Sequence, residues 1–141
     1  MLTFLKRSHK LLANGKLAIA PRPRHIEQLM KLTGVKATSK PKRVPGDAVM
    51  EEVDNSEKLG DVEASEYRSC VGILLYLATG LPHAQHSMRH LSTGMSSPTK
   101  QLKDVIRHLV SFLSGTKDLH VCLDFRGDDA GLHHCYKTAC Q

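Results

Sequence analysis

The sequence predicts an α+β fold that is mainly helical: an N-terminal β-hairpin and short helix, a linker, three consecutive helices and a C-terminal strand. Three observations lead to this prediction. An Asn-Gly pair separates two apolar runs near the N-terminus, two prolines divide a later helical stretch, and a short alternating run follows it. With 141 residues, 40% of them hydrophobic and no Trp, the chain is expected to bury one mainly aliphatic core.

The hairpin is predicted from residues 4–12 and 16–20, which flank the Asn14-Gly15 pair. Asn-Gly is a strong short-range hairpin signal, because both central positions of the tight turn need a positive φ. Pro21 then ends the second strand, since proline cannot donate to a ladder of hydrogen bonds.

A short helix is predicted to run from Pro23, whose fixed φ suits a first helical turn, to a stop at Gly34. Its apolar positions recur at helical spacing: Ile26, Leu29, Met30 and Thr33. Residues 1–34 form the N-terminal part of the predicted organisation. Residues 35–64 hold two prolines, scattered charge and little periodicity, and we expect a linker or an extended crossing segment there.

Three consecutive helices are predicted within residues 65–125. The first begins with Ser65 as its N-cap and is apolar on most of its circumference until Gly80, which indicates burial on most sides. A second helix over residues 82–92 begins with a proline. The third, over residues 98–113, has the clearest amphipathic stripe, made of Leu102, Val105, Ile106, Leu109 and Leu113.

The C-terminal strand is predicted at residues 119–125, where apolar residues alternate: Leu119, Val121, Leu123 and Phe125. Residues 126–141 are expected to form a disordered tail, since a polar chain end without an apolar pattern has little to bury.

Charge is distributed unevenly around the net value of +6. Residues 1–45 carry eleven Lys or Arg and one acid, whereas residues 46–66 carry eight acids and one base. A basic block of this density attracts a polyanion such as nucleic acid, or an anionic membrane surface. The acidic block is either a solvated linker or an intramolecular screen. The candidate nucleic-acid contacts lie on or beside the hairpin, with ordinary solubility as the alternative: Lys6, Arg7, Lys10, Lys16, Arg22 and Arg24.

Three histidines recur at i, i+3 and i+7, so that a helix would place His83, His86 and His90 on one polar face. Two imidazoles four residues apart can share a metal ion, but a structural site needs further ligands and none stands nearby in the sequence. We therefore expect this face to meet solvent or nucleic acid, and we predict no metal site there.

A second group of possible ligands lies near the C-terminus: His133, His134, Cys135 and Cys140. Their spacing fits no standard zinc finger, and the preceding Asp128-Asp129 pair is typical of a turn. The sequence contains no phosphate-binding loop, dinucleotide fingerprint or Ser/His/Asp order. It therefore predicts no catalytic residue, no metal ligand and no cofactor in this chain.

A series of motifs runs from residue 67 to residue 119: Tyr-x-Ser-x-Val-Gly-x-Leu-x-Tyr-Leu, a proline, Ser-x-Pro, an amphipathic helix and Gly-Thr-x-x-Leu. The positions that carry it are Tyr67, Ser69, Val71, Gly72, Leu74, Tyr76, Leu77, Pro82, Ser96, Pro98, Leu109, Leu113, Gly115, Thr116 and Leu119. In this order the motifs resemble the reverse transcriptase region of copia-type retrotransposon polyproteins, downstream of the catalytic loop. Residues 15–35 are similar to the hairpin strand and first helix that follow that loop.

The resemblance implies the end of the palm, the thumb and the start of the connection of an RNA-directed DNA polymerase, in contact with template–primer. It also implies that the catalytic Tyr-x-Asp-Asp motif would lie before residue 1. The aspartate that usually follows the family's proline is His83 here, and the Tyr-x-Asp-Ala-Asp start of a ribonuclease H domain does not follow Phe125. Polymerase chemistry needs two metal ions held by carboxylates, so the magnesium expected for the full-length family enzyme has no ligands in this chain.

We therefore expect a catalytically incomplete fragment of a copia-type reverse transcriptase, which contacts template–primer and acts with the rest of the polyprotein. The alternatives are a standalone basic nucleic-acid-binding module and a degenerate, non-functional gene fragment. The longest apolar run, residues 70–79, is too short to span a bilayer, and the N-terminus lacks a secretion signal. An intracellular location without a membrane partner is expected.

Overall fold

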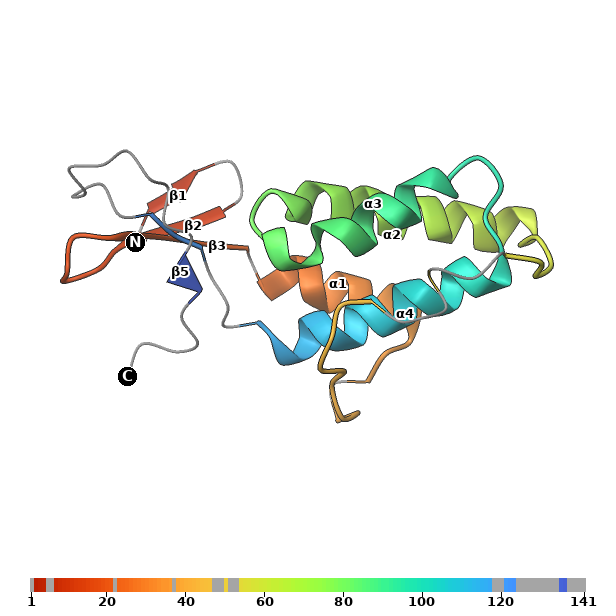
Figure 1. Ribbon diagram of the computed structural model, residues 1–141, viewed down its shortest axis with the longest axis horizontal. Helices are drawn as coiled ribbons and strands as arrows, with labels where there is room; N and C mark the ends of the chain where they lie inside the picture. The colour runs from red at the N-terminus through yellow and green to blue at the C-terminus, as the bar shows by residue number, and fades with distance from the viewer. Residues whose placement is uncertain are drawn as a thin grey trace.

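The computed structural model describes residues 2–4, 7–21, 23–36, 38–46, 50, 54–117, 121–123 and 135–136. Within them, a five-stranded antiparallel sheet lies beside four helices (Figure 1). The strands are β1 (Leu2–Phe4), β2 (Arg7–Leu11), β3 (Leu17–Pro21), β4 (Val121–Leu123) and β5 (Cys135–Tyr136). The helices are α1 (Pro23–Thr33), α2 (Asp61–Ala78), the 3₁₀ turn η2 (Pro82–Ala84), α3 (Gln85–Thr93) and α4 (Lys100–Gly115). The predicted α+β, mainly helical class is confirmed.

The predicted hairpin is formed by β2 and β3, with a different turn from the one expected. Leu12 N donates to Lys16 O at 2.9 Å, and Gly15 N donates to Leu12 O at 2.8 Å. The loop therefore has three residues, with Gly15 in the left-handed region at φ 77°. This geometry is common for hairpins because the left-handed residue restores the strand twist after an ordinary turn. The expected first strand is also divided, since β1 pairs back onto β2.

The first helix begins and ends where the sequence indicates. α1 starts at Pro23, and Gly34 follows it with a φ of 72°. The predicted apolar residues Ile26, Leu29 and Met30 are buried. They face α2 and α4, which both contact α1.

The start of α2 differs from the prediction that Ser65 is its N-cap. The helix begins at Asp61, one turn earlier, with Gly60 as the N-cap and no side-chain cap. Two acids, Asp61 and Glu63, occupy its first turn and interact favourably with the positive end of the helix dipole. Ser65 thus lies within α2, one turn after its start, and is exposed to solvent.

The second and third predicted helices are also adjusted at their starts. Pro82 begins the 3₁₀ turn η2, and the α-helix proper starts at Gln85 instead of continuing from residue 82. Before α4, Pro98 is buried outside the helix. Thr99 is the N-cap, and its side-chain oxygen accepts a hydrogen bond from Leu102 N at 3.4 Å.

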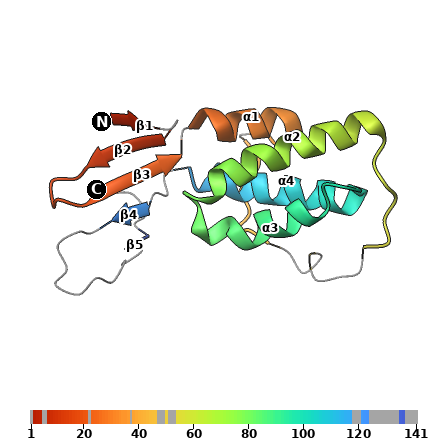
Figure 2. The same ribbon diagram turned by 90° about the horizontal axis from the view of Figure 1, so that it is seen from above.

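The core lies among the four helices, which form a closed ring (Figure 2). α1 contacts α2 and α4, and α3 contacts the same two helices. Short connections between α2, α3 and α4 favour antiparallel neighbours. The predicted apolar residues of α4 are buried in this core. The side chains at its centre have no exposed surface: Val71, Leu74, Leu91 and Leu109.

At the edge of the sheet, β4 forms part of the strand predicted at residues 119–125, and its buried position is Cys122. Val121 and Leu123, which the alternation singled out, are half-exposed. Within the predicted tail, Cys135–Tyr136 form β5 and pair with β4. Cys122 lies outside the helical core.

Three helices meet at one polar contact. Tyr67 of α2 donates its hydroxyl to the carbonyl oxygen of Leu91, at the end of α3, at 2.6 Å. Burial raises the pKa of Tyr67 to about 12. A Cβ atom on Gly94 would clash with the Leu102 side chain of α4 and lie 3.2 Å from the Tyr67 hydroxyl. Glycine therefore permits the close approach of these three helices.

Residues 38–46, named the strap, cross α4 and reach α3. A Cβ atom on Gly115 would lie 2.5 Å from the Pro41 Cβ, so α4 and the strap touch closely at this point. Further along, His108 Nε2 lies 3.0 Å from Val44 O, and Ser87 Oγ donates to Pro45 O at 2.9 Å. These contacts hold the strap against the helices along its length.

Replacing Leu109 with alanine should lower the free energy of unfolding by about 2–5 kcal/mol, because the side chain is 0% exposed in the core. The matched control Leu75→Ala, at a position that is 41% exposed, should lower it by less than about 1 kcal/mol. Urea unfolding monitored by circular dichroism measures both. Equal losses in the two variants would contradict the observed core.

Replacing Tyr67 with phenylalanine should destabilise the chain by about 0.5–1.5 kcal/mol, because the carbonyl of Leu91 loses the shorter of its two hydrogen bonds and keeps the one from Gly94 N. The same unfolding experiment applies. An unchanged midpoint would show that the contact contributes nothing to stability.

Candidate nucleic-acid interface

β2 and β3 direct their side chains to two faces of the sheet, because successive residues of a strand alternate. The register places Arg7 opposite Pro21 on one face and Lys10 opposite Ala18 on the other. Lys10 is exposed, whereas Arg7 is half-buried. The two predicted cations of β2 therefore do not form one continuous row.

Arg7 joins the sheet to the helices. Its guanidinium Nη2 donates to Thr79 Oγ1 at the end of α2. Its Cζ lies 5.8 Å from the ring centroid of Tyr76, within the range of a cation–π interaction. The Tyr76 ring also lies against His25 of α1, with ring centroids 5.3 Å apart. Any phosphate contact by Arg7 would compete with these internal contacts.

The other predicted cations differ in access to solvent. Lys10 on β2 and Arg24 in the first turn of α1 are exposed. Lys16 is half-buried in the hairpin loop, where its backbone N–H donates to Asn14 Oδ1 at 3.1 Å. Lys6 and Arg22 lie outside the described residues. Of the predicted cations that are described, Lys10 and Arg24 are the most accessible to a phosphate.

The three histidines do not form the common polar face that a single helix would give. His83 lies in η2, half-buried, with its ring edge-on to Phe112 of α4 at a centroid distance of 5.6 Å. Burial lowers the pKa of His83. His86 is exposed on α3, and His90 is half-buried. The single helix expected to carry all three histidines is thus corrected to a 3₁₀ turn followed by α3, and their contact with nucleic acid stays a prediction.

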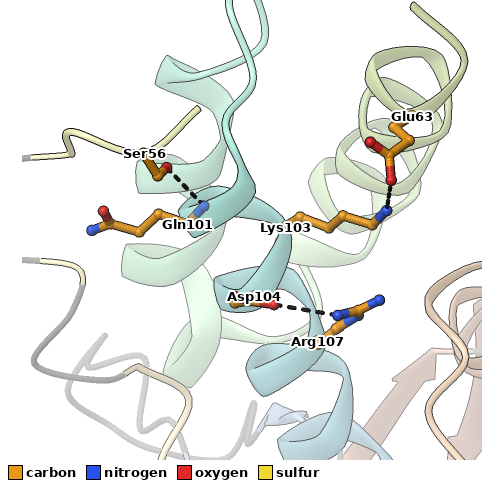
Figure 3. Close-up of polar contacts among 6 residues, drawn as sticks. All are labelled: Ser56, Glu63, Gln101, Lys103, Asp104 and Arg107. Carbon is orange, nitrogen blue, oxygen red and sulfur yellow. Dashed lines mark hydrogen bonds and ion pairs between the residues drawn. The ribbon is translucent and has the colours of Figure 1, made fainter. Parts of the chain in front are cut away.

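The acidic part of the linker is bound to the corner before α4. Residues 54–60, named the clasp, are held there by backbone hydrogen bonds: Leu59 N donates to Pro98 O and Lys100 N donates to Glu57 O, both at 2.9 Å. Ser56 Oγ accepts a hydrogen bond from the backbone N–H of Gln101 at 3.0 Å (Figure 3).

The carboxylate of Asp54 completes the clasp by accepting a hydrogen bond from Thr99 Oγ1. This bond, and to a smaller extent the nearby charge of His90, lowers the pKa of Asp54. His90 thus lies near the clasp.

The cations on the exposed side of α4 are paired with carboxylates. Lys100 pairs with Glu57 of the clasp, and Lys103 pairs with Glu63 of α2. Arg107 Nη1 lies 3.3 Å from Asp104 Oδ1; the latter two pairs are drawn in Figure 3. The hydrogen bond and charge of Lys100 lower the pKa of Glu57, and those of Lys103 lower the pKa of Glu63. These acids screen α4, which favours the second of the two interpretations of the acidic block.

A further set of cations was not singled out from the sequence. Lys40, Lys42 and Arg43 of the strap are exposed, and no ion pair between described residues engages them. They were counted in the basic block of residues 1–45. The available signal was therefore charge density alone, which does not distinguish open cations from paired ones.

The described residues supply no metal centre. No three His, Cys, Asp or Glu side chains among them lie close enough to hold an ion. The carboxylates that two magnesium ions need are thus not assembled in this part of the chain, and the expected absence of a cofactor stays a prediction.

Burial, assisted by the charge of Glu66, raises the pKa of the Cys70 thiol. Of the C-terminal candidates, His133, His134, Cys140 and the Asp128-Asp129 pair lie outside the described residues.

Open cations and paired cations are therefore both present in the described part of the chain. Open ones lie on the hairpin, at the start of α1 and on the strap. No described helix is both long and apolar enough to cross a bilayer. No protein-family model, curated protein or solved structure matches this chain.

The half-buried His83 should make stability depend on pH. Its pKa is lower in the folded than in the unfolded chain, so the unfolded chain binds more protons in mildly acidic solution. The contribution of neutral His83 is complete above the reference value of about 6.5, and it is lost as the pH falls towards the lowered folded value. Between about pH 7.5 and pH 5.5, we expect wild type to lose more stability than His83→Asn.

Urea unfolding at both pH values measures this difference, with the exposed His86→Asn as the control that keeps the wild-type pH dependence. Identical pH dependence in wild type and His83→Asn would refute the role of His83.

Proposed function

We propose that this chain is the template–primer-contacting part of a copia-type reverse transcriptase, and that it holds nucleic acid through phosphates without carrying polymerase chemistry itself. The observation that carries the proposal is that two of the predicted cations, Lys10 on the hairpin and Arg24 on α1, are exposed. Phosphate contacts of this kind position a nucleic acid without reading its sequence.

The resemblance supports the proposal through the positions of its motif residues. Tyr67, Val71 and Leu74 are buried in the core, and Tyr67 also makes the contact that joins α2 to α3. Pro98 is buried at the corner before α4, and Gly115 permits the close contact of the strap. Motif residues with such structural roles are consistent with the thumb-like scaffold that the resemblance implies.

Catalysis is assigned to segments outside the described residues. The resemblance puts the catalytic aspartates before residue 1, and magnesium would bind to those carboxylates. The partners in this proposal are template–primer and the rest of the polyprotein, in an intracellular setting.

A standalone basic binding module is the second candidate, and the closed ring of helices favours it. The helical core is complete within the described residues, with Leu74, Leu91 and Leu109 fully buried. A chain with such a core can fold without a further subunit. Both candidates predict phosphate binding, and they differ in whether polymerase segments belong to the same polypeptide.

The chain should bind an RNA–DNA hybrid duplex, with an affinity that falls steeply between about 50 and 200 mM salt. Replacing Lys10 and Arg24 together with glutamine should flatten the plot of log K against log salt by about 2, about 1 for each lost phosphate contact. Filter binding at several salt concentrations measures both.

The matched control is the pair Lys100→Gln and Lys103→Gln, which removes the same charge from residues that are already paired. It should leave the slope close to that of wild type. The absence of binding at low salt would sink the proposed function.

With a primed template, nucleotides and magnesium, the purified chain should extend no primer, because the chemistry needs carboxylates that these residues do not assemble. Extension that survives repurification would overturn the assignment of catalysis to other segments.

A further inference from the structure

We infer that the strap and the second half of α1 form an additional phosphate-binding surface, so that a bound nucleic acid runs from the hairpin along α1 to the strap. This inference rests on the proposed function, and it extends the interface beyond the six candidate cations on or beside the hairpin. Its cations are Lys31 of α1, Lys40, Lys42 and Arg43 of the strap, and Lys36 and Lys117 beside Lys31.

The strap presents its cations from a fixed backbone. Pro41 packs against Gly115, and Lys40 and Lys42 flank Pro41 in the chain. The carbonyl groups of Val44 and Pro45 are then held by His108 and Ser87. Cations on an anchored segment lose less conformational entropy when they bind than cations on a free loop.

The surface is continuous with the predicted interface along α1. Arg24 and Lys31 are both exposed and lie seven residues apart, which places them on the same side of the helix with a separation of about 10 Å along its axis. Lys31, Lys36 and Lys117 line one open depression, together with the single acid Glu27. The basic positions thus lead from the start of α1 to the end of α4.

The cations of the strap differ from those of α4 in their ion pairs. On α4, each of Lys100, Lys103 and Arg107 already lies beside a carboxylate. A cation that already neutralises a carboxylate must give up that partner before it can neutralise a phosphate, so it displaces fewer of the counterions condensed on a nucleic acid. Lys40 and Lys42 have no such partner among the described ion pairs. A polyanion is therefore attracted to the strap in preference to α4.

The observations favour nucleic acid over an anionic membrane. A segment that lies in a membrane surface is typically an amphipathic helix with a broad apolar face. The strap has no helical residues, and Val44 is its one exposed large hydrophobic residue, at 57% exposure. Rows of cations without an apolar face suit a phosphate backbone instead.

The test compares three double variants of equal charge change: Lys40→Gln with Lys42→Gln in the strap, Lys10→Gln with Arg24→Gln at the hairpin, and Lys100→Gln with Lys103→Gln on α4. Binding to an RNA–DNA hybrid duplex is measured at several salt concentrations, and thermal unfolding confirms that each variant is folded. The strap variant should flatten the salt slope by about 2, as the hairpin variant does, while the α4 variant keeps the wild-type slope.

The possible failures are distinct. If wild type does not bind, both the proposed function and this inference are wrong. If the hairpin variant is weakened and the strap variant matches wild type, only the inference is wrong. If the α4 variant weakened binding as much as the strap variant, the effect would be one of net charge alone, and the inference would be overturned. The inference would also be overturned if wild type bound phosphatidylserine vesicles more tightly than the duplex and the strap variant lost the binding to vesicles.

Discussion

The hydroxyl of Tyr67 donates to the carbonyl of Leu91, and the helices reach that contact because residue 94 has no side chain. The hydrogen bond fixes the end of α3 against α2, and the missing Cβ lets Leu102 of α4 approach the same point. A tyrosine hydroxyl is buried at acceptable cost only when it has a partner. Here the partner is a carbonyl at a helix end, which also accepts a hydrogen bond from Gly94 N at 3.3 Å. The ring of four helices and the corner before α4 depend on this contact.

Because that corner is fixed, the linker has two definite places to bind. The clasp pairs with the backbone on either side of Thr99, through Leu59 to Pro98 and Glu57 to Lys100. The strap packs where α4 ends, at Gly115. α4 thus contacts the acidic clasp at its N-terminal end, and the basic strap crosses its C-terminal half. The fold, more than the composition, decides which charges remain available to a ligand.

Much of the architecture was predictable because it rests on local patterns. The stripe of α4, the proline start of α1 and the hairpin all follow from spacing and backbone preference. The errors arise where distant residues decide. Asp61 instead of Ser65 begins α2, next to a clasp that is anchored to Pro98.

The candidate site was less predictable than the fold. A helical wheel cannot place His83, because a 3₁₀ turn at Pro82 sets the ring against Phe112. The strand periodicity of residues 121–123 does not tell which face is covered, and the covered residue is Cys122. Access of a cation to a phosphate depends on partners forty or more residues away, as Lys100 with Glu57 shows. Such pairings leave no local trace in the sequence.

Under the proposed function, the ion pairs of α4 would affect binding more than stability. Exposed pairs of this kind contribute little to stability, so the bundle does not depend on them. Their effect on the field is larger, because each one cancels a positive charge that would otherwise compete with the strap for a polyanion. Acidic residues neutralise the cations of α4 and leave those of the strap unpaired among the described ion pairs. A polyanion would therefore be attracted to the strap side of the chain. The motif residues build the scaffold that holds this arrangement, and under the proposed function the surface cations would set the path of a phosphate backbone.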